Sequence, residues 1–155
     1  MTTIDLGVNF EDVKDADKFP VLPNGTYQFT VAKIDLKASG PASKIPGRPM
    51  LVWTLTFTHP ESGQKVNIFH NSVLPWLPPG QSELDISGVG MLVGVCKAVG
   101  LPWAGAQIDP TAYLGRSGHA VVSQRTKQIK DPAGTGLYVD DPNGAKNNNI
   151  DSFVN

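Results

Sequence analysis

The chain has 155 residues, 40% of them hydrophobic and 17% charged, which suits one domain with a hydrophobic core and excludes disorder driven by charge. Its 16 glycines and 13 prolines follow no period, so they exclude collagen and favour a turn-rich domain of strands. Apolar stretches are too short for a membrane span, and the first residues do not resemble a signal peptide. Cys96 has no second cysteine to pair with. We therefore expect a cytoplasmic protein without metal or cofactor.

The net charge of −1 conceals an uneven distribution of charge along the chain. Between Lys33 and Lys130, ten basic residues face five acidic ones, whereas the two ends together hold three basic and nine acidic residues. A basic middle segment permits an anionic partner, because neutralising phosphates requires lysine and arginine. An ordinary solvated surface explains the same distribution.

Residues 1–19 are polar and acidic, and we expect them to form an acidic N-terminal segment in front of a domain that covers residues 20–155. Sparse apolar residues would anchor this segment on the domain: Ile4, Leu6, Val8, Phe10 and Phe19.

The first predicted strand covers Thr26–Lys37. Its alternation of apolar and polar residues changes phase near Ala32 and Lys33, which indicates a β-bulge of the kind that bends a strand in a small barrel. The segment Ala38–Pro49 is rich in serine, glycine, proline and basic residues, and it predicts a long loop.

Met50–Thr58 carries the strongest strand pattern in the sequence, with Trp53 on the apolar face. After a turn at residues 59–63, Lys65–Leu74 predicts a third strand. His70 has the same parity as the apolar residues of this strand, whereas Phe69 has the opposite parity.

The next predicted element is a helix over Leu84–Val99, with Asp85 or Ser87 as its N-cap and a stop at Gly100-Leu101-Pro102. A short helical turn should begin at Asp109-Pro110. Strand patterns return at His119–Ile129 and at Asn148–Val154.

Three antiparallel strands, a helix and two more strands predict an all-β fold. That order is typical of the OB-fold, a five-stranded Greek-key barrel with its helix between strands three and four. An open β-sandwich with one covering helix is the alternative. In the barrel, the loops Ala38–Pro49 and Asp131–Lys146 would be the binding loops.

Several segments resemble a family of bacteriophage proteins: Leu22-Pro-Asn-Gly-Thr-Tyr, Leu51-Val-Trp-Thr-Leu, Ala98-Val-Gly-Leu-Pro, Leu114-Gly-Arg-Ser-Gly-His-Ala-Val-Val and the ending Asn147-Asn-Asn-Ile-Asp-Ser-Phe-Val. The resemblance covers Phe19 to Val154. It implies an OB-fold single-stranded DNA-binding protein of phage DNA replication and recombination, acting in the host cytoplasm. A phage recombinase, helicase or polymerase would be its protein partner, and a homo-oligomer is a further possible assembly. The chain lacks the acidic tip that recruits partners in cellular single-strand binders.

Binding single strands without sequence preference requires aromatic side chains for base stacking and cations along the backbone. If Val66 and Ile68 face the core, Phe69 faces outward beside Lys65, although a bulge could reverse this. Trp53 shares its face with leucines, so we expect it in the core. Trp76 and Tyr138 lie in predicted loops and are further candidate contacts.

The candidate phosphate contacts border the two predicted binding loops or lie on the fourth strand: Lys37, Lys44, Arg48, Arg125, Lys127 and Lys130. Charged residues that protect a sheet edge from aggregation would give the same pattern.

Catalysis has little support in the sequence. The three histidines lack metal-ligand spacing, Cys96 lies in an apolar part of the predicted helix, and Asp140-Asp141 is typical of a solvated turn. We therefore expect a protein that is not an enzyme. A structural phage protein, such as a capsid decoration or tail module, or a protein-binding β domain remains the alternative to a DNA-binding protein.

Overall fold

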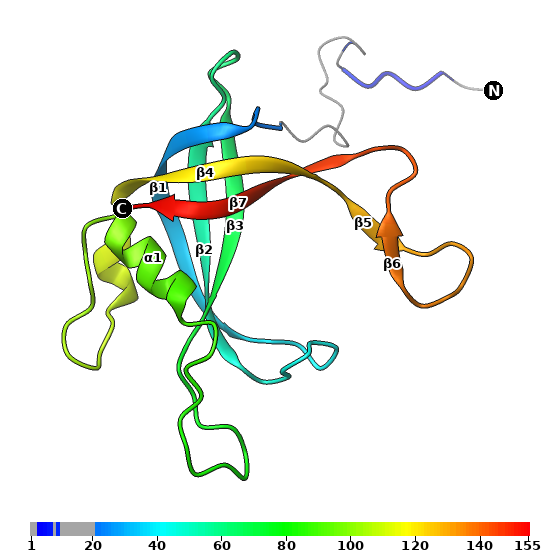
Figure 1. The fold of residues 1–155 in the computed structure, drawn as a ribbon. Coiled ribbons are helices and arrows are strands. Elements are labelled where there is room, and N and C mark those ends of the chain that lie inside the picture. The colour runs from blue at the N-terminus through cyan, green and yellow to red at the C-terminus, as the bar shows by residue number, and fades with distance from the viewer. Residues whose placement is uncertain (1–2, 8, 10–20) are drawn as a thin grey trace.

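A computed structural model describes residues 3–7, 9 and 21–155. These residues form a mostly β structure with one short helix between the third and fourth strands (Figure 1). The elements are β1 (Gly25–Ala38), β2 (Pro49–Thr58), β3 (Lys65–Val73), α1 (Gly90–Ala98), the 3-10 helix η2 (Pro110–Tyr113), β4 (Ser117–Thr126), β5 (Gln128–Lys130), β6 (Tyr138–Asp140) and β7 (Lys146–Val154).

Five strands make one antiparallel sheet in the order β3-β2-β1-β4-β7. β3 and β7 are its two edges, and within the described residues no ladder of hydrogen bonds joins them. The curved sheet brings these edges toward each other (Figure 1), and the rings of His70 and Phe153 meet there at 4.9 Å. The mostly β class is therefore confirmed, whereas the sheet is not closed by hydrogen bonds.

The predicted bulge in the first strand is present. Val31 pairs with Leu55 and Lys33 with Thr54, so Ala32 is an extra residue in β1 relative to β2. A bulge of this kind increases bending and twist. It lets β1 pair with β4 in its first half and with β2 in its second half.

The core lies between the inner face of the sheet and α1, and it contains the aromatic residues that the alternation pattern placed inward. Trp53 is fully buried and makes an edge-to-face contact with Tyr113, at 5.5 Å between ring centroids. Gly118 allows α1 to approach β4, because a Cβ at that position would lie 2.7 Å from the carbonyl oxygen of Ala98.

The predicted helix is correct in its end but wrong in its start. α1 begins at Gly90, after Gly88 adopts a φ of +76°, which an α-helix does not allow. Asp85 and Ser87 are therefore not helix caps. Asp85 instead pairs with Trp76 across the loop that precedes the helix. At η2 the prediction holds, since Asp109 caps it by accepting a hydrogen bond from the Thr111 amide.

The predicted strand His119–Ile129 is in fact two elements. β4 ends at Thr126, and β5 pairs with β6 as a separate two-stranded hairpin, called here the arm. The predicted loop Asp131–Lys146 therefore contains a strand. The last strand begins two residues earlier than predicted, at Lys146.

Of the acidic N-terminal segment, the structure describes only residues 3–7 and 9. Ile4 and Leu6 are each 77% exposed, so they do not anchor this segment on the domain as predicted. Val8, Phe10 and Phe19 lie outside the described residues. None of the helices in the described ranges has the length and hydropathy needed to cross a membrane.

Candidate functional site

The outer face of the β2–β3 ladder carries exposed polar side chains around one exposed aromatic ring. Val66 and Ile68 are buried, so the alternate residues of β3 point outward, and Phe69 is 69% exposed. Its cross-strand partner on β2 is Thr54. The prediction that Phe69 faces outward is therefore confirmed. The exposed residues of β3 are Lys65, Asn67, Phe69 and Asn71.

The bulge in β1 extends this face across a third strand. Because Ala32 is the extra residue, Lys33 pairs with Thr54, which itself pairs with Phe69. Lys33, Thr54 and Phe69 thus form one row across three strands. Lys37 is exposed at the end of β1, opposite Met50. Sequence reasoning missed Lys33 as a site residue, although the phase change that it did detect was the signal.

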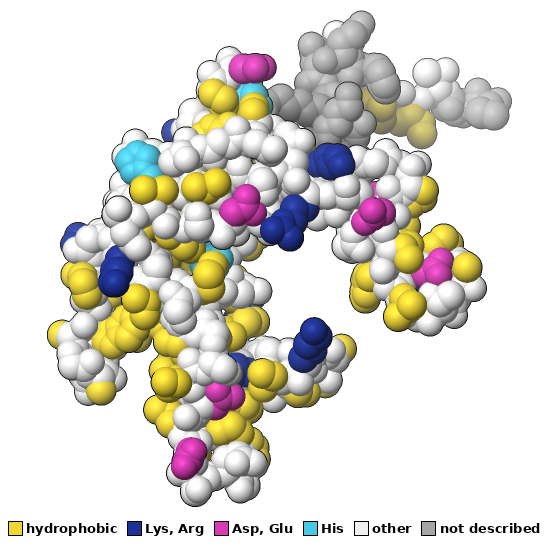
Figure 2. All heavy atoms as spheres, viewed as in Figure 1, with side chains coloured by type: hydrophobic (Ala, Val, Ile, Leu, Met, Phe, Trp, Pro, Cys, Tyr) yellow, Lys and Arg dark blue, Asp and Glu magenta, His cyan; other side chains and the backbone are white. Residues whose placement is uncertain are grey.

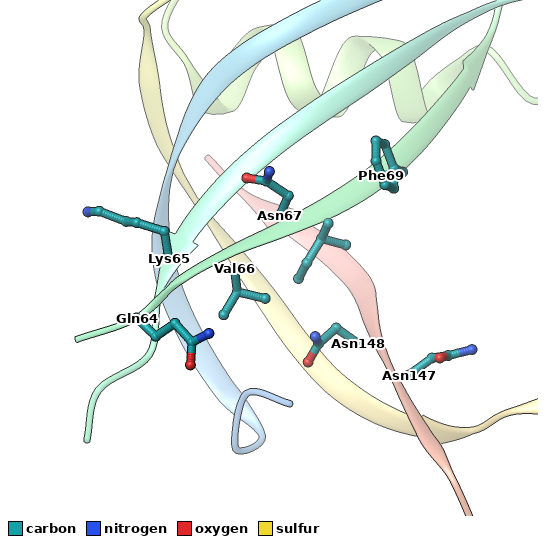
Figure 3. Close-up of a pocket in the computed structure, with 8 residues that line it drawn as sticks. Gln64, Lys65, Val66, Asn67, Phe69, Asn147 and Asn148 are labelled. Atoms are coloured by element: carbon teal, nitrogen blue, oxygen red, sulfur yellow. The ribbon is translucent and has the colours of Figure 1, made fainter. Parts of the chain in front are cut away.

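A groove of about 630 Å³ lies between the two free edges of the sheet, beside this face. Figure 3 shows Val66 of β3 and the two asparagines of β7 on opposite sides of it. Its lining residues are Gln64, Lys65, Val66, Asn67, Ile68, Phe69, Asn147 and Asn148. The two asparagines were not predicted as site residues, since a single sequence does not reveal which strands become neighbours at the edges.

The molecule is hollowed between the arm and the loop that joins β1 to β2 (Figure 2), and lysine and arginine side chains border the hollow. Within the arm, Lys130 pairs with Tyr138, whose side chain is 71% exposed. The arm is joined to the sheet through Lys127, whose amide donates to the Ala145 carbonyl and whose carbonyl accepts from the Asp141 amide.

The remaining predicted cations are exposed but differ in their surroundings. Lys44 lies in the loop between β1 and β2. Arg125 lies on β4, with its guanidinium 3.5 Å from the Asp151 carboxylate and two thirds of its side chain exposed. Lys65 donates a hydrogen bond to the Thr58 hydroxyl at 2.9 Å. Arg125 and Lys65 therefore remain exposed to solvent despite these contacts.

Arg48, predicted as a phosphate contact, does not belong to the exposed cations. Its side chain is 2% exposed and donates to the carbonyls of Leu74 and Ser87, at 2.9 and 2.8 Å. Its guanidinium also pairs with the Asp85 carboxylate at 3.2 Å. Hydrogen bonds from Ser87 and the positive charge of this arginine lower the pKa of Asp85. The role of Arg48 is therefore to join the β1–β2 loop to the segment before α1.

Trp76 is half-buried beside this ion pair and is not presented freely to a ligand. The guanidinium carbon of Arg48 lies 6.0 Å from the centre of its ring, a cation–π distance. Its backbone pairs with that of Asp85 through two hydrogen bonds. The structure thus gives Trp76 a packing role in the same cluster as Arg48, away from the row that contains Phe69.

Titratable groups do not form a metal-binding cluster within the described part of the chain. No three histidine, cysteine, aspartate or glutamate side chains there lie close enough to hold a metal ion. Cys96 is buried, and its burial raises the pKa of the thiol. His70 is buried against Phe153, and its burial lowers the pKa of the imidazole to about 4.

Comparison of the chain with protein-family models and with curated proteins finds no match in either. The site must therefore be interpreted from its own geometry.

Proposed function

We propose that the chain binds single-stranded DNA without sequence preference, on the face that contains Phe69. The observation that carries this proposal is the exposed Phe69 ring in one row with Thr54 and Lys33. The ammonium of Lys33 lies 3.4 Å from the Asp35 carboxylate on the same face, and two thirds of the lysine side chain is exposed. Because every base has a flat π-face, an exposed ring can stack on a base whatever the sequence.

The distribution of charge supports the same proposal. Lys33, Lys37 and Lys65 lie on or beside this face, and Lys130 and Tyr138 lie on the arm. A strand of DNA that ran from this face to the arm would meet cations for its phosphates and the exposed rings of Phe69 and Tyr138 for its bases.

We further propose that the sheet is an OB-type barrel whose last seam is closed by side chains. The strand order β3-β2-β1-β4-β7, the bulge in β1 and the helix between β3 and β4 support this assignment. The contact between His70 and Phe153 lies at the seam where β3 and β7 would meet. A role in phage DNA replication or recombination, with a recombinase, helicase or polymerase as partner, remains a proposal that rests on the resemblance.

The experiment is a fluorescence anisotropy titration of a labelled oligo-dT strand and of a matched duplex at several salt concentrations. The proposal expects tighter binding to the single strand, with an affinity that falls as salt rises. Absence of binding to either DNA at low salt would contradict it. That result would favour a structural phage protein or a protein-binding domain.

A further inference from the structure

The segment between β3 and α1 forms a small hairpin that carries exposed apolar side chains. The backbones of Trp76 and Asp85 pair through two hydrogen bonds, of 3.2 and 2.8 Å. Residues 75–86 are called here the leucine loop. Figure 1 shows this loop projecting from the bottom of the molecule, and Figure 2 shows hydrophobic side chains gathered on it with acidic ones beside them.

The two faces of the leucine loop have different surroundings. Trp76 and Asp85 lie on the face that contacts Arg48. Their neighbours along the chain point to the other face, because successive side chains of paired extended segments alternate. These neighbours include Leu77, Leu84 and Ile86, which are 56%, 58% and 66% exposed. Large apolar side chains grouped on a surface in this way mark a site of interaction with another protein.

Arg48 holds the leucine loop in shape before any partner binds. Its buried guanidinium donates hydrogen bonds to the carbonyls of Leu74 and Ser87, one on each side of the hairpin. At the turn, the Gln81 amide donates to the Pro78 carbonyl. A loop that is already ordered loses little conformational entropy on docking, so a few apolar side chains can support an association.

A cleft of suitable size lies beside the last turn of α1. It measures about 190 Å³ and is lined by Val93, Cys96, Lys97, Pro102 and Trp103. An apolar cavity of about 150 Å³ holds a benzene molecule, so this cleft can accept one leucine side chain. Because Arg48 fixes the stem of the leucine loop at the start of α1, a loop that enters the cleft comes from a second copy.

Charge also favours a second copy as the occupant. Glu83 is exposed and directly precedes Leu84 in the leucine loop. Lys97 is exposed and is the charged residue among those that line the cleft. Docking of Leu84 in the cleft therefore brings a carboxylate within reach of an ammonium group.

We propose that the leucine loop of one copy docks in the α1 cleft of a second copy, with Leu84 against Trp103 and Glu83 beside Lys97. Loop and cleft are different surfaces, so the contact joins copies head to tail. The contact is small for a stable interface, so the association is weak and depends on concentration. At the low protein concentrations of the DNA titration the copies are separate, and Lys97 stays outside the DNA path.

Sedimentation velocity of the full-length chain without DNA tests the proposal over concentrations from the low to the high micromolar range. We expect the average mass to rise with concentration. Leu84→Asp in the loop and Pro102→Glu at the cleft should each raise the dissociation constant at least about tenfold. Leu137→Asp, at a leucine of similar exposure on the arm, is the matched control and should keep the association.

A mixture of the two variants distinguishes this contact from any other. The Leu84→Asp copy keeps its cleft and the Pro102→Glu copy keeps its loop. An equal mixture should therefore form a complex of one copy of each and nothing larger. Exchange of the charges is a second test, because Glu83→Lys and Lys97→Glu should each weaken the association and the double variant should restore it.

A chain that stays monomeric at every concentration would overturn the proposal. A mixture of the two variants that stays monomeric, or an association that Leu84→Asp leaves unchanged, would overturn it as well. Failure of the double charge variant to restore the association would contradict the pairing of Glu83 with Lys97. Urea unfolding shows whether each variant is folded. No DNA is present, so this test and the DNA-binding test can fail independently.

Discussion

Phe69 and Lys33 lie in one row of the sheet because both pair with Thr54, although 35 residues and a long loop separate them along the chain. Successive strands lie about 4.8 Å apart, so the Cα atoms of Phe69 and Lys33 lie about 10 Å from each other. That separation lets one nucleotide stack on the ring while a nearby phosphate meets the cation.

Replacing Phe69 with alanine should weaken binding to oligo-dT by about five- to 150-fold, because stacking contributes about 1–3 kcal/mol per base. The free energy of unfolding should change by less than about 0.5 kcal/mol, since the ring is mostly exposed. Anisotropy titration and urea unfolding measure the two effects. The buried Trp53 provides the contrasting variant, because Trp53→Ala should cost about 3–5 kcal/mol of stability. Large destabilisation by Phe69→Ala with unchanged affinity would contradict the binding role.

Lys65→Met should change the salt dependence of binding. If Lys65 contacts one phosphate, the slope of log affinity against log salt should become shallower by about 0.7. Lys97 on α1 is also exposed but lies on another part of the molecule, so Lys97→Met is the matched control and should keep the slope. Equal slopes for Lys65→Met and the unmodified chain would remove Lys65 from the proposed DNA path.

The buried His70 should make the protein less stable as the pH falls from 6.5 toward 4. Burial lowers the pKa of His70 to about 4 in the folded protein, so the unfolded chain binds the extra proton over this range. The stabilisation is complete above pH 6.5, and about 2 kcal/mol of it should be lost at pH 5. His70→Phe keeps a ring against Phe153 and should remove this loss in urea unfolding.

The exposed His119 gives the control for that measurement, because His119→Gln should leave the pH dependence as it is in the unmodified chain. The lowered pKa values of Asp85, Asp131 and Asp151 affect stability only at more acidic pH. An unchanged pH dependence in His70→Phe would mean that another group titrates.

Arg48→Met should destabilise the protein by about 3 kcal/mol, because it removes one member of a mostly buried ion pair and leaves two carbonyls without their donor. Lys44→Met, in the same loop but exposed, should change the stability by less than about 0.5 kcal/mol. Urea unfolding of both variants makes the comparison. Similar stability for the two would show that Arg48 does not hold the loop in place.

Alternation predicted the strands and their inner faces well, because burial of one face imposes a period of two that local sequence retains. The buried Val66 and the exposed Phe69 follow directly from it, as does the bulge at Ala32. The beginning of the helix was beyond this reasoning. Gly88 lies inside the predicted helix Leu84–Val99, whereas in the structure its left-handed φ belongs to the loop before α1.

The site was predictable where one strand determines it and unpredictable where distant segments meet. Arg48 lies among glycine, serine and proline and has the sequence surroundings of an exposed cation. Its burial depends on contacts with Asp85 and Ser87, which follow β3 in the chain and are distant from Arg48 in sequence. The arm has a local sequence signal for a hairpin, because the turn after Asp131 lies between the apolar residues Ile129 and Val139, which pair with each other.

The burial of Cys96 has a practical consequence, because it is the one cysteine of the chain. A cysteine introduced at an exposed position would be the accessible thiol, and a maleimide dye would modify it selectively. Thr135, near the tip of the arm, is such a position. A dye there would report directly on whether the arm changes its surroundings when a ligand enters the hollow.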